Sequence, residues 1–477
     1  MSNLLRPRAI ASILALTLPA CVIPLTDRNT PEENGGVTGE PANCGARSNI
    51  EPKSSLDGPK GEKLVGRFQL PKPADPETGA PAETATYFDW SGNHITFRFR
   101  GTKKVTVKLA LPASQNPQDQ LVEVVVDNLA PVTRQITVTK DAKGNPTITP
   151  EASFEIGGLS DGPHEVTIWK NTEAQKGGLL YSGIDLNGGE FLESRRRFRR
   201  MEVIGDSITC GYGNTGSNAT CPFEVKIREV KLPDGKVAPV TVPLTENQYL
   251  SFTSQTARNL DADVVTLCWS GKGVYKNYKE NVRIDPTGAP VPVDDATTTV
   301  PQLWERTLAA AKEPLWDFAQ EKEEDKPQVV VISLGTNDFA RDTKPDLPEN
   351  AEEGALPGDN QPDGDLNFPE EMEKFYKTYA DFVQKVRERR PNAHVFLATP
   401  PMLTDQFPLD NARTKMKDVL RRIASERNKG GDGKVYAMDL VEMGFRYGLG
   451  CDYHPNLEVH AIMAQQLTGA IRSKTCW

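Results

Sequence analysis

A serine and a distant histidine are the residue types in this chain that nucleophilic catalysis requires. Ser207 ends a Gly-Asp-Ser segment that directly follows an apolar run, and His454 lies in the segment Asp-Tyr-His-Pro. A serine hydroxyl is a weak nucleophile until a base takes its proton, and histidine serves as that base most often. We therefore expect Ser207 Oγ to attack an ester carbonyl while His454 accepts the proton and then passes it to the leaving alcohol.

Two groups are candidates for orienting the imidazole of His454. Asp452 stands two residues before His454, and its carboxylate can hold the imidazole if the loop bends suitably. A backbone carbonyl can do the same, which would leave a serine–histidine dyad. Of the two, we favour the carboxylate of Asp452.

Donors for the charge that develops on the carbonyl oxygen are expected in two further segments. Trp-Ser-Gly-Lys-Gly (269–273) and Gly-Thr-Asn-Asp (335–338) each follow an apolar run. The N–H groups of Ser207 and Gly271, with the side-chain amide of Asn337, would supply three donors to an oxyanion. Gly273 is the alternative to Gly271. An asparagine after a strand is also a common turn residue, so Asn337 alone is weak support.

Strand and helix patterns alternate from about residue 198 to 477. Amphipathic stripes predict helices, and short apolar runs predict buried strands between them. The strands are expected at 201–205, 263–269, 329–334, 394–399 and 435–440, and the helices at 372–386, 412–423 and 457–471. This alternation predicts an α/β domain with a three-layer parallel sheet. Because ligands bind at the carboxyl ends of parallel strands, residues that follow the strands should meet there.

Residues 61–190 carry a different, period-2 pattern. Alternating segments separated by Gly-, Asn- and Asp-rich turns predict a jelly-roll-like β-sandwich. Its strands are expected at 95–100, 104–109, 122–126, 136–139, 153–156 and 164–169. The basic run at 194–201 is expected to be a solvated linker. Three long polar segments, at about 214–247, 279–300 and 340–368, follow strands or their loops and should rim the active site.

The N-terminus has the features of an export signal. Arg6 and Arg8 precede a short apolar run that is too short to span a bilayer. Leu-Pro-Ala-Cys at 18–21 resembles the bacterial lipobox, so residues 1–21 are expected to end at a lipid-modified Cys21. By resemblance to Gram-negative sorting rules, Val22 favours the outer membrane, and plain secretion is the alternative. Residues 22–60, rich in Pro, Gly and Asn, are expected to be a flexible linker.

Charge and cysteine content narrow the functional classes. A formal net charge of −9 argues against a general nucleic-acid binder. Neither a Cys-x-x-Cys nor a His-Glu-x-x-His segment occurs, so we expect no metal and no cofactor. Besides Cys21, six cysteines remain, an even number that permits disulfides in an exported protein. The pairings that we expect are Cys210 with Cys221 and Cys451 with Cys476, and Cys268 is expected to be a buried free thiol.

The four catalytic segments resemble, in order and context, those of the SGNH hydrolases. The resemblance covers about 200–477, although that family usually carries its aspartate three residues before the histidine, where this chain has Cys451. The segments Phe-Asp-Trp-Ser-Gly (88–92) and Thr-Phe-Arg-Phe-Arg-Gly-Thr (96–102) extend it to about 61–477, where the chain resembles carbohydrate esterase family 2. That family tends toward the same Asp-x-His spacing. The resemblance implies removal of acetyl groups from plant polysaccharides such as xylan or glucomannan.

Other substrates and another class of function remain open. The same residues would serve an esterase acting on O-acetylated cell-envelope glycan or on a lysophospholipid. A surface carbohydrate-binding protein with a weak esterase site is the alternative class. Aromatic residues near the motifs could stack on sugar rings or simply pack: Trp269, Tyr275, Tyr278 and Tyr453. The absence of a long apolar stripe near the motifs weighs against a long-chain lipase.

Overall fold

The computed structural model describes most of the chain, and all statements below concern the residues that it describes. These are 36–42, 54–74, 82–112, 118–137, 139–140, 146–147, 153–231, 237–278, 282–284, 290–292, 298–340, 366–444 and 447–477. The expected signal segment 1–21, with Cys21, lies outside these ranges, as does most of the expected linker. Within them, no helix combines the length and the hydropathy needed to cross a bilayer.

Two antiparallel sheets form the N-terminal β-sandwich, which confirms the predicted architecture. One has the order β10-β5-β12-β3, with β10 (Ser153–Gly157), β5 (Lys104–Ala110), β12 (Leu179–Asp185) and β3 (Thr86–Phe88). The other has the order β13-β4-β11-β6-β7, with β13 (Glu190–Phe191), β4 (His94–Arg100), β11 (His164–Lys170), β6 (Gln120–Val126) and β7 (Val132–Ile136), and β2 (Glu62–Val65) pairs with β4. Their inner faces share one apolar core that includes Phe97, Val107 and Val166.

One sandwich strand lies earlier in the chain than the sequence predicts. β7 covers Val132–Ile136 rather than 136–139, and it is the edge strand of its sheet. Its first four residues are exposed and Ile136 alone is buried. An edge strand with a single buried residue lacks the alternating apolar pattern that reveals the other strands, which explains the misplaced prediction.

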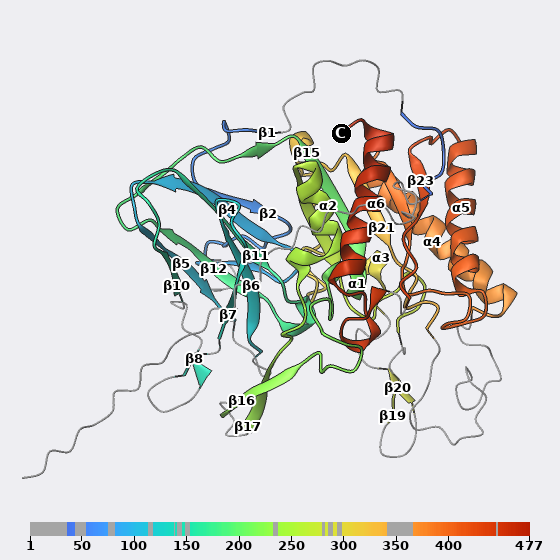
Figure 1. The fold of residues 1–477 in the computed structure, drawn as a ribbon, viewed down its shortest axis with the longest axis horizontal. Helices are drawn as coiled ribbons and strands as arrows, with labels where there is room; N and C mark the ends of the chain where they lie inside the picture. Colours follow the sequence, from blue (N-terminus) through green and yellow to red (C-terminus); the bar gives the residue numbers. More distant parts are fainter. Residues whose placement is uncertain are drawn as a thin grey trace, which may run out of the picture. The chain divides into compact units, whose positions relative to one another are not determined.

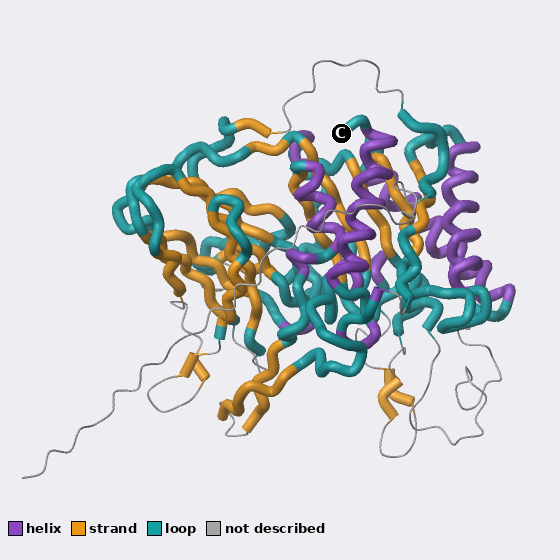
Figure 2. The backbone as a smooth tube through the Cα atoms, in the orientation of Figure 1, coloured by secondary structure: helices purple, strands orange, loops and turns teal. Residues whose placement is uncertain are grey.

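The C-terminal domain is built on a parallel sheet with the order β18-β15-β21-β22-β23, as predicted. Its strands are β18 (Ala262–Cys268), β15 (Arg199–Gly205), β21 (Val329–Ser333), β22 (His394–Thr399) and β23 (Val435–Asp439). Helices α4 (Pro369–Arg389) and α5 (Ala412–Lys429) pack on one face, while α2 (Phe252–Leu260) and α6 (Leu457–Thr475) pack on the other. Figure 2 shows these α-helices (purple) gathered around the sheet (orange). The three-layer α/β arrangement is therefore confirmed.

Further elements connect or extend the two domains. They are β1 (Ser54–Ser55), β8 (Thr139–Lys140), β9 (Pro146–Thr147), η1 (Ala174–Lys176), β14 (Arg196–Arg197), α1 (Ser207–Cys210), β16 (Val225–Lys231), β17 (Val237–Val242), η2 (Gln248–Leu250), β19 (Val282–Ile284), β20 (Pro290–Pro292), α3 (Val300–Leu303), η3 (Glu323–Asp325) and η5 (Cys451–Tyr453). The hairpin of β16 and β17 projects from the lower edge of the view in Figure 1.

The order of the strands brings three of the catalytic segments together. β15 lies between β18 and β21 and runs parallel to both. Ser207 follows β15, the 269–273 segment follows β18, and the 335–338 segment follows β21. Because these three strands are neighbours and point the same way, their loops emerge side by side at one edge of the sheet.

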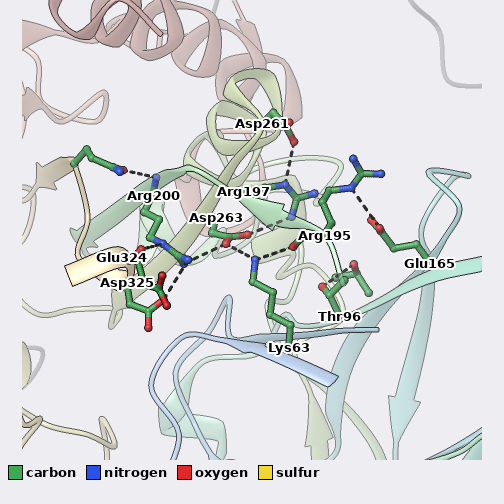
Figure 3. Close-up of polar contacts among 12 residues, drawn as sticks. Lys63, Thr96, Glu165, Arg195, Arg197, Arg200, Asp261, Asp263, Glu324 and Asp325 are labelled. Atoms are coloured by element: carbon green, nitrogen blue, oxygen red, sulfur yellow. Dashed lines mark hydrogen bonds and ion pairs between the residues drawn. The ribbon is translucent and has the colours of Figure 1, made fainter. Parts of the chain in front are cut away.

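The two domains share buried contacts within one compact unit, Pro31–Trp477. Asp263, at the start of β18, forms ion pairs with Lys63 of the sandwich and with Arg197 and Arg200 (Figure 3). The expectation of a solvated linker at 194–201 is thus wrong, because this run contains β14, begins β15 and pairs its arginines with acidic groups. A charge run taken alone does not reveal such partners, which lie in distant segments.

The disulfide predictions are also wrong. Cys210 is bonded to Cys268, which is therefore not a free thiol, and Cys221 is bonded to Cys451. Cys476 is disulfide-bonded too, but not to Cys451. The physical reason is strand order: Cys268 stands opposite Gly205 in the parallel sheet, which brings it close to the helix that carries Cys210. Sequence spacing carries no such information.

Candidate active site

Ser207 lies at the first position of α1, immediately beyond the end of β15. Asp206 caps this short helix, and its Oδ1 accepts a hydrogen bond from Ile208 N at 3.0 Å. Gly205 is required at the turn, because a Cβ there would lie 2.0 Å from Thr209 Oγ1. The sharp strand-to-helix turn leaves Ser207 only 6% exposed, at the carboxyl edge of the sheet.

The imidazole of His454 reaches the serine directly. His454 Nε2 lies 2.9 Å from Ser207 Oγ, although 247 positions separate the two residues in the sequence. The loop that carries the histidine is tied to the loop after α1 in two ways. Cys451 N donates to Gly213 O at 2.9 Å, and Cys451 is disulfide-bonded to Cys221. The polar segment at 214–247 therefore does border the site, through Cys221.

The backbone of Asp452, rather than its carboxylate, orients the imidazole. His454 Nδ1 lies 2.7 Å from the carbonyl oxygen of Asp452, while the carboxylate of Asp452 accepts a hydrogen bond of 3.2 Å from Tyr212 OH. Asp452 and Tyr453 both have left-handed backbone conformations, with φ of 51° and 58°. The chain therefore follows the alternative of a backbone carbonyl, and differs from the favoured expectation of a carboxylate.

This contact determines which nitrogen of His454 carries the proton. A carbonyl oxygen can only accept, so Nδ1 must be the donor. In the neutral ring the lone pair is then on Nε2, which faces Ser207 Oγ. Burial lowers the pKa of His454, and the Asp452 carbonyl offsets this in part. The imidazole is thus held neutral and in the tautomer that can accept the proton of the serine.

Aromatic rings cover the histidine on one side. The ring of Tyr212 lies 4.4 Å from that of His454, centroid to centroid, and stacks at 3.6 Å on Phe223. Such packing removes water from around the imidazole, which accounts for the direction of its pKa shift.

The loop that contains Gly271 is held by the segment after β21. Both oxygens of the buried Asp338 accept hydrogen bonds from backbone N–H groups, those of Val274 (3.1 Å), Tyr275 (2.6 Å) and Lys276 (3.0 Å). Asn337 Nδ2 donates to Lys272 O at 2.9 Å, so this amide lies beside the same loop. The structure thus places the predicted Asn337 against the loop that carries Gly271. Sequence reasoning included Asp338 in its segment but missed this role.

Gly271 is favoured over Gly273 as the oxyanion donor. Gly273 N donates to Asn277 Oδ1 at 3.2 Å, so its N–H is already used inside the loop. Gly271 has a φ of +79°, a conformation that glycine adopts without strain. The remaining donor of the expected set, Ser207 N–H, is at the start of α1 at the same sheet edge.

A buried glutamate from the sandwich also touches this loop. Glu173 Oε2 accepts a hydrogen bond of 2.6 Å from Ser270 N, and Glu173 Oε1 accepts another from Ser270 Oγ. The sequence offers no signal for this contact, because the two residues are 97 positions apart and belong to different domains.

The other four histidines lie in structural surroundings. His94 stacks on Trp169, His394 stacks on Tyr436, and His460 Nδ1 accepts from Phe252 N at 3.0 Å. His164 lies between Asp127 and Ser160, an arrangement that superficially resembles a catalytic triad.

His164 nevertheless differs from His454 in the direction in which its pKa is shifted. Nδ1 lies 2.5 Å from an oxygen of Asp127, and Nε2 lies 3.1 Å from the backbone carbonyl of Ser160. Burial opposes the charged form, but these two acceptors together raise the pKa of His164. In the protonated ring, which these acceptors favour, both nitrogens donate and no lone pair is left to accept a proton from Ser160 Oγ.

Groups of three or more potential metal-ligating side chains are not found among the described residues.

Comparison with known proteins finds a matching family for each of the two domains. Residues 203–462 match the GDSL-like Lipase/Acylhydrolase family, and residues 65–194 match the Carbohydrate esterase 2 N-terminal domain. Cellulase/esterase CelE of Acetivibrio thermocellus is 30% identical over 416 residues, which are 86% of this chain and 39% of that protein. An acetylxylan esterase / glucomannan deacetylase of Cellvibrio japonicus is 23% identical over 399 residues, 83% of this chain and 88% of that one.

Solved structures show the same two-domain arrangement. A family two carbohydrate esterase from Clostridium thermocellum, solved in complex with cellohexaose, has a TM-score of 0.60 and 27% identity, and the match covers 86% of this chain and 98% of that chain. The order of the segments around Ser207 and His454, the parallel sheet and these matches agree. The chain therefore belongs to the GDSL-like lipase/acylhydrolase family and carries the N-terminal domain of carbohydrate esterase family 2 before its catalytic domain.

Proposed function

We propose that the chain is a serine esterase that removes acetyl groups from O-acetylated polysaccharide of the xylan or glucomannan type. The observation that carries the proposal is the hydrogen bond of 2.9 Å between His454 Nε2 and Ser207 Oγ, with His454 Nδ1 held by the Asp452 carbonyl. This arrangement activates a serine for attack on an ester and needs no cofactor.

The first half of the reaction forms an acetyl-enzyme. Ser207 Oγ attacks the acetyl carbonyl carbon as His454 Nε2 takes the hydroxyl proton, and the Asp452 carbonyl stabilises the imidazolium that results. The carbonyl oxygen becomes negatively charged, facing the N–H groups of Ser207 and Gly271 and the amide of Asn337. Loss of one such donor typically costs about 3 kcal/mol of transition-state stabilisation.

The second half releases acetate. His454 Nε2–H donates its proton to the sugar oxygen, which leaves as the deacetylated hydroxyl. A water molecule then gives a proton to His454 and attacks the acetyl carbon on Ser207. Collapse of the second tetrahedral intermediate returns the proton to Ser207 Oγ and frees acetate.

Exposed aromatic residues beside the catalytic groups favour a sugar as the alcohol portion of the ester. Tyr453 is 56% exposed and adjoins His454, and Tyr278 is 47% exposed and donates its N–H to Gly271 O at 2.7 Å. Trp269 and Tyr275 instead pack against the apolar core of the domain, which makes them structural residues. A small acetyl group and a stacked sugar ring suit a site that is flanked by exposed aromatic side chains.

We further propose that Cys21 is the lipid-modified residue of an exported protein that contacts the membrane through this anchor only. Arg6, Arg8 and the Leu-Pro-Ala-Cys segment support an export signal. The disulfides Cys210–Cys268 and Cys221–Cys451 support an oxidising compartment.

Ser207→Ala should abolish acetate release. Because the variant lacks the nucleophile, we expect the turnover of 4-nitrophenyl acetate and of acetylated xylan or glucomannan to fall by about 10⁴-fold or more. Assays on acetylated peptidoglycan, a lysophospholipid, and butyrate and octanoate esters would show the acyl and carrier preference. Equal activity of wild type and variant would exclude the serine mechanism, and wild-type binding of polysaccharide without turnover would favour a binding protein.

Asp452→Asn should keep turnover within about threefold of wild type, because the carbonyl that holds His454 Nδ1 is unchanged. Asparagine also tolerates the left-handed backbone found at this position. His454→Asn is the matched variant and should be inactive. A hundredfold loss of kcat in Asp452→Asn would instead show that the carboxylate takes part.

The acid limb of kcat/KM should have an apparent pKa below 6.5. His454 must be neutral to accept a proton, and burial lowers its pKa, so activity persists until the pH falls below the ordinary histidine range. Burial also raises the pKa of Asp206 to about 7. A mutation is therefore needed to show which of the two groups titrates in the acid limb. Tyr212→Ala exposes the imidazole and should move the limb upward, whereas a limb unaffected by this variant would not belong to His454.

Cys21→Ser should prevent lipid attachment in an export-competent bacterial host. Radiolabelled palmitate should enter the wild-type chain and not the variant, whose esterase activity should remain intact because residue 21 is remote in sequence from both catalytic segments. Labelling of both proteins, or of neither, would contradict the assignment.

A further inference from the structure

We infer that Glu173, contributed by the N-terminal domain, is a positioning residue for the oxyanion loop at 269–273. The inference rests on the proposed esterase function and adds to it a role for the sandwich domain in catalysis. Glu173 follows strand β11 and precedes η1, and it is fully buried.

Glu173 contacts Ser270, the residue next to the expected oxyanion donor Gly271. Both oxygens of Glu173 are engaged by Ser270, one by its N–H at 2.6 Å and the other by its hydroxyl. The N–H of Gly271 belongs to the peptide plane that joins it to Ser270, and this plane is rigid. Fixing Ser270 at two points therefore limits the directions in which Gly271 N–H can point.

Gly271 is the position in this loop where such a restraint matters. Glycine with a φ of +79° can exchange easily with other backbone conformations, because it has no Cβ. Asp338 anchors the loop beyond Gly271, at residues 274–276, and Glu173 anchors it before Gly271. Together the two carboxylates hold the glycine from both sides.

The surroundings of Glu173 keep it available as an acceptor. Glu246 is also buried beside it. Burial is the larger cause, and repulsion from Glu173 the second, that raise the pKa of Glu246 well above its usual range. Lys170 and Lys176 supply positive charge to the same cluster. Burial raises the pKa of Glu173, and the two hydrogen bonds from Ser270 and the charge of Lys176 lower it in part. The donors on Ser270 thus favour the carboxylate form of Glu173, to which they bind most strongly.

The cluster of Glu173 and Glu246 also borders the segment that follows α1, the helix that begins at the nucleophile Ser207. Asn247, next to Glu246, donates its N–H to Gly211 O at 3.1 Å, just after α1. A buried carboxylate is costly to retain for stability alone. Glu173 lies between the loop of Gly271 and the segment beside α1. This position is explained if Glu173 preserves the geometry of the oxyanion donors.

A second contact between the domains offers a matched control. Lys63 pairs with Asp263 at the start of β18 (Figure 3). Ser270, in contrast, comes just after the end of this strand. The two contacts are separated by the length of the strand, about 20 Å at the usual rise per residue. Lys63→Ala therefore perturbs the same interface far from the site.

Glu173→Ala should lower kcat for 4-nitrophenyl acetate by roughly ten- to a hundredfold, with KM changed less than about threefold, because the donor is misplaced only where charge develops. Glu173→Gln should recover most of the loss, since its amide oxygen still accepts from Ser270 N. Lys63→Ala should lower the thermal midpoint without lowering kcat. If Glu173→Ala does not fold, Ser270→Ala provides the test. This variant removes one of the two hydrogen bonds to Glu173 and should show a smaller decrease of kcat.

Two outcomes would overturn the inference. One is wild-type kcat in Glu173→Ala, or in Ser270→Ala where that variant replaces it. The other is an equal loss of kcat in Lys63→Ala, which would indicate a general loss of stability. Ser207→Ala separates this failure from that of the proposed function: if it is inactive while Glu173→Ala is fully active, the inference alone is wrong.

Discussion

The structure depends most on one constraint, the fixed orientation of the His454 ring between an acceptor and a hydroxyl. The carbonyl of Asp452 can only accept, so it keeps the proton on Nδ1 and leaves Nε2 free for Ser207 Oγ, 2.9 Å away. The left-handed residues 452 and 453 present that carbonyl, and the Cys221–Cys451 disulfide ties their loop to the segment after the nucleophile. A carboxylate is therefore not needed to set the tautomer.

The rest of the fold brings distant segments to this ring. Three adjacent parallel strands deliver Ser207, the loop of Gly271 and the segment of Asn337 to one edge of the sheet. Buried carboxylates then hold the Gly271 loop, Asp338 from the same domain and Glu173 from the sandwich. On this account the N-terminal domain, besides any contact with polysaccharide, helps to maintain the site's geometry.

Sequence patterns predicted the elements well and the cross-chain contacts poorly. Buried strands and amphipathic helices such as α4 have periodic apolar residues, and the catalytic segments follow strands in a recognisable order. The edge strand β7 has a single buried residue, so its apolar pattern does not reveal its position. The Cys210–Cys268 pairing, the ion pairs of Arg197 and the bond from Ser270 to Glu173 depend on which strands are neighbours. The Asp452 carbonyl depends on backbone angles that spacing does not reveal.

The most direct test of the central claim is a crystal structure of the chain after inactivation by a 4-nitrophenyl phosphonate, whose adduct mimics the tetrahedral intermediate. We expect a phosphorus bonded to Ser207 Oγ, with one anionic oxygen about 2.7–3.1 Å from the N–H groups of Ser207 and Gly271 and from Asn337 Nδ2. His454 Nδ1 should remain on the Asp452 carbonyl. A phosphonate bonded to another residue, or an anionic oxygen that faces solvent away from these donors, would contradict it.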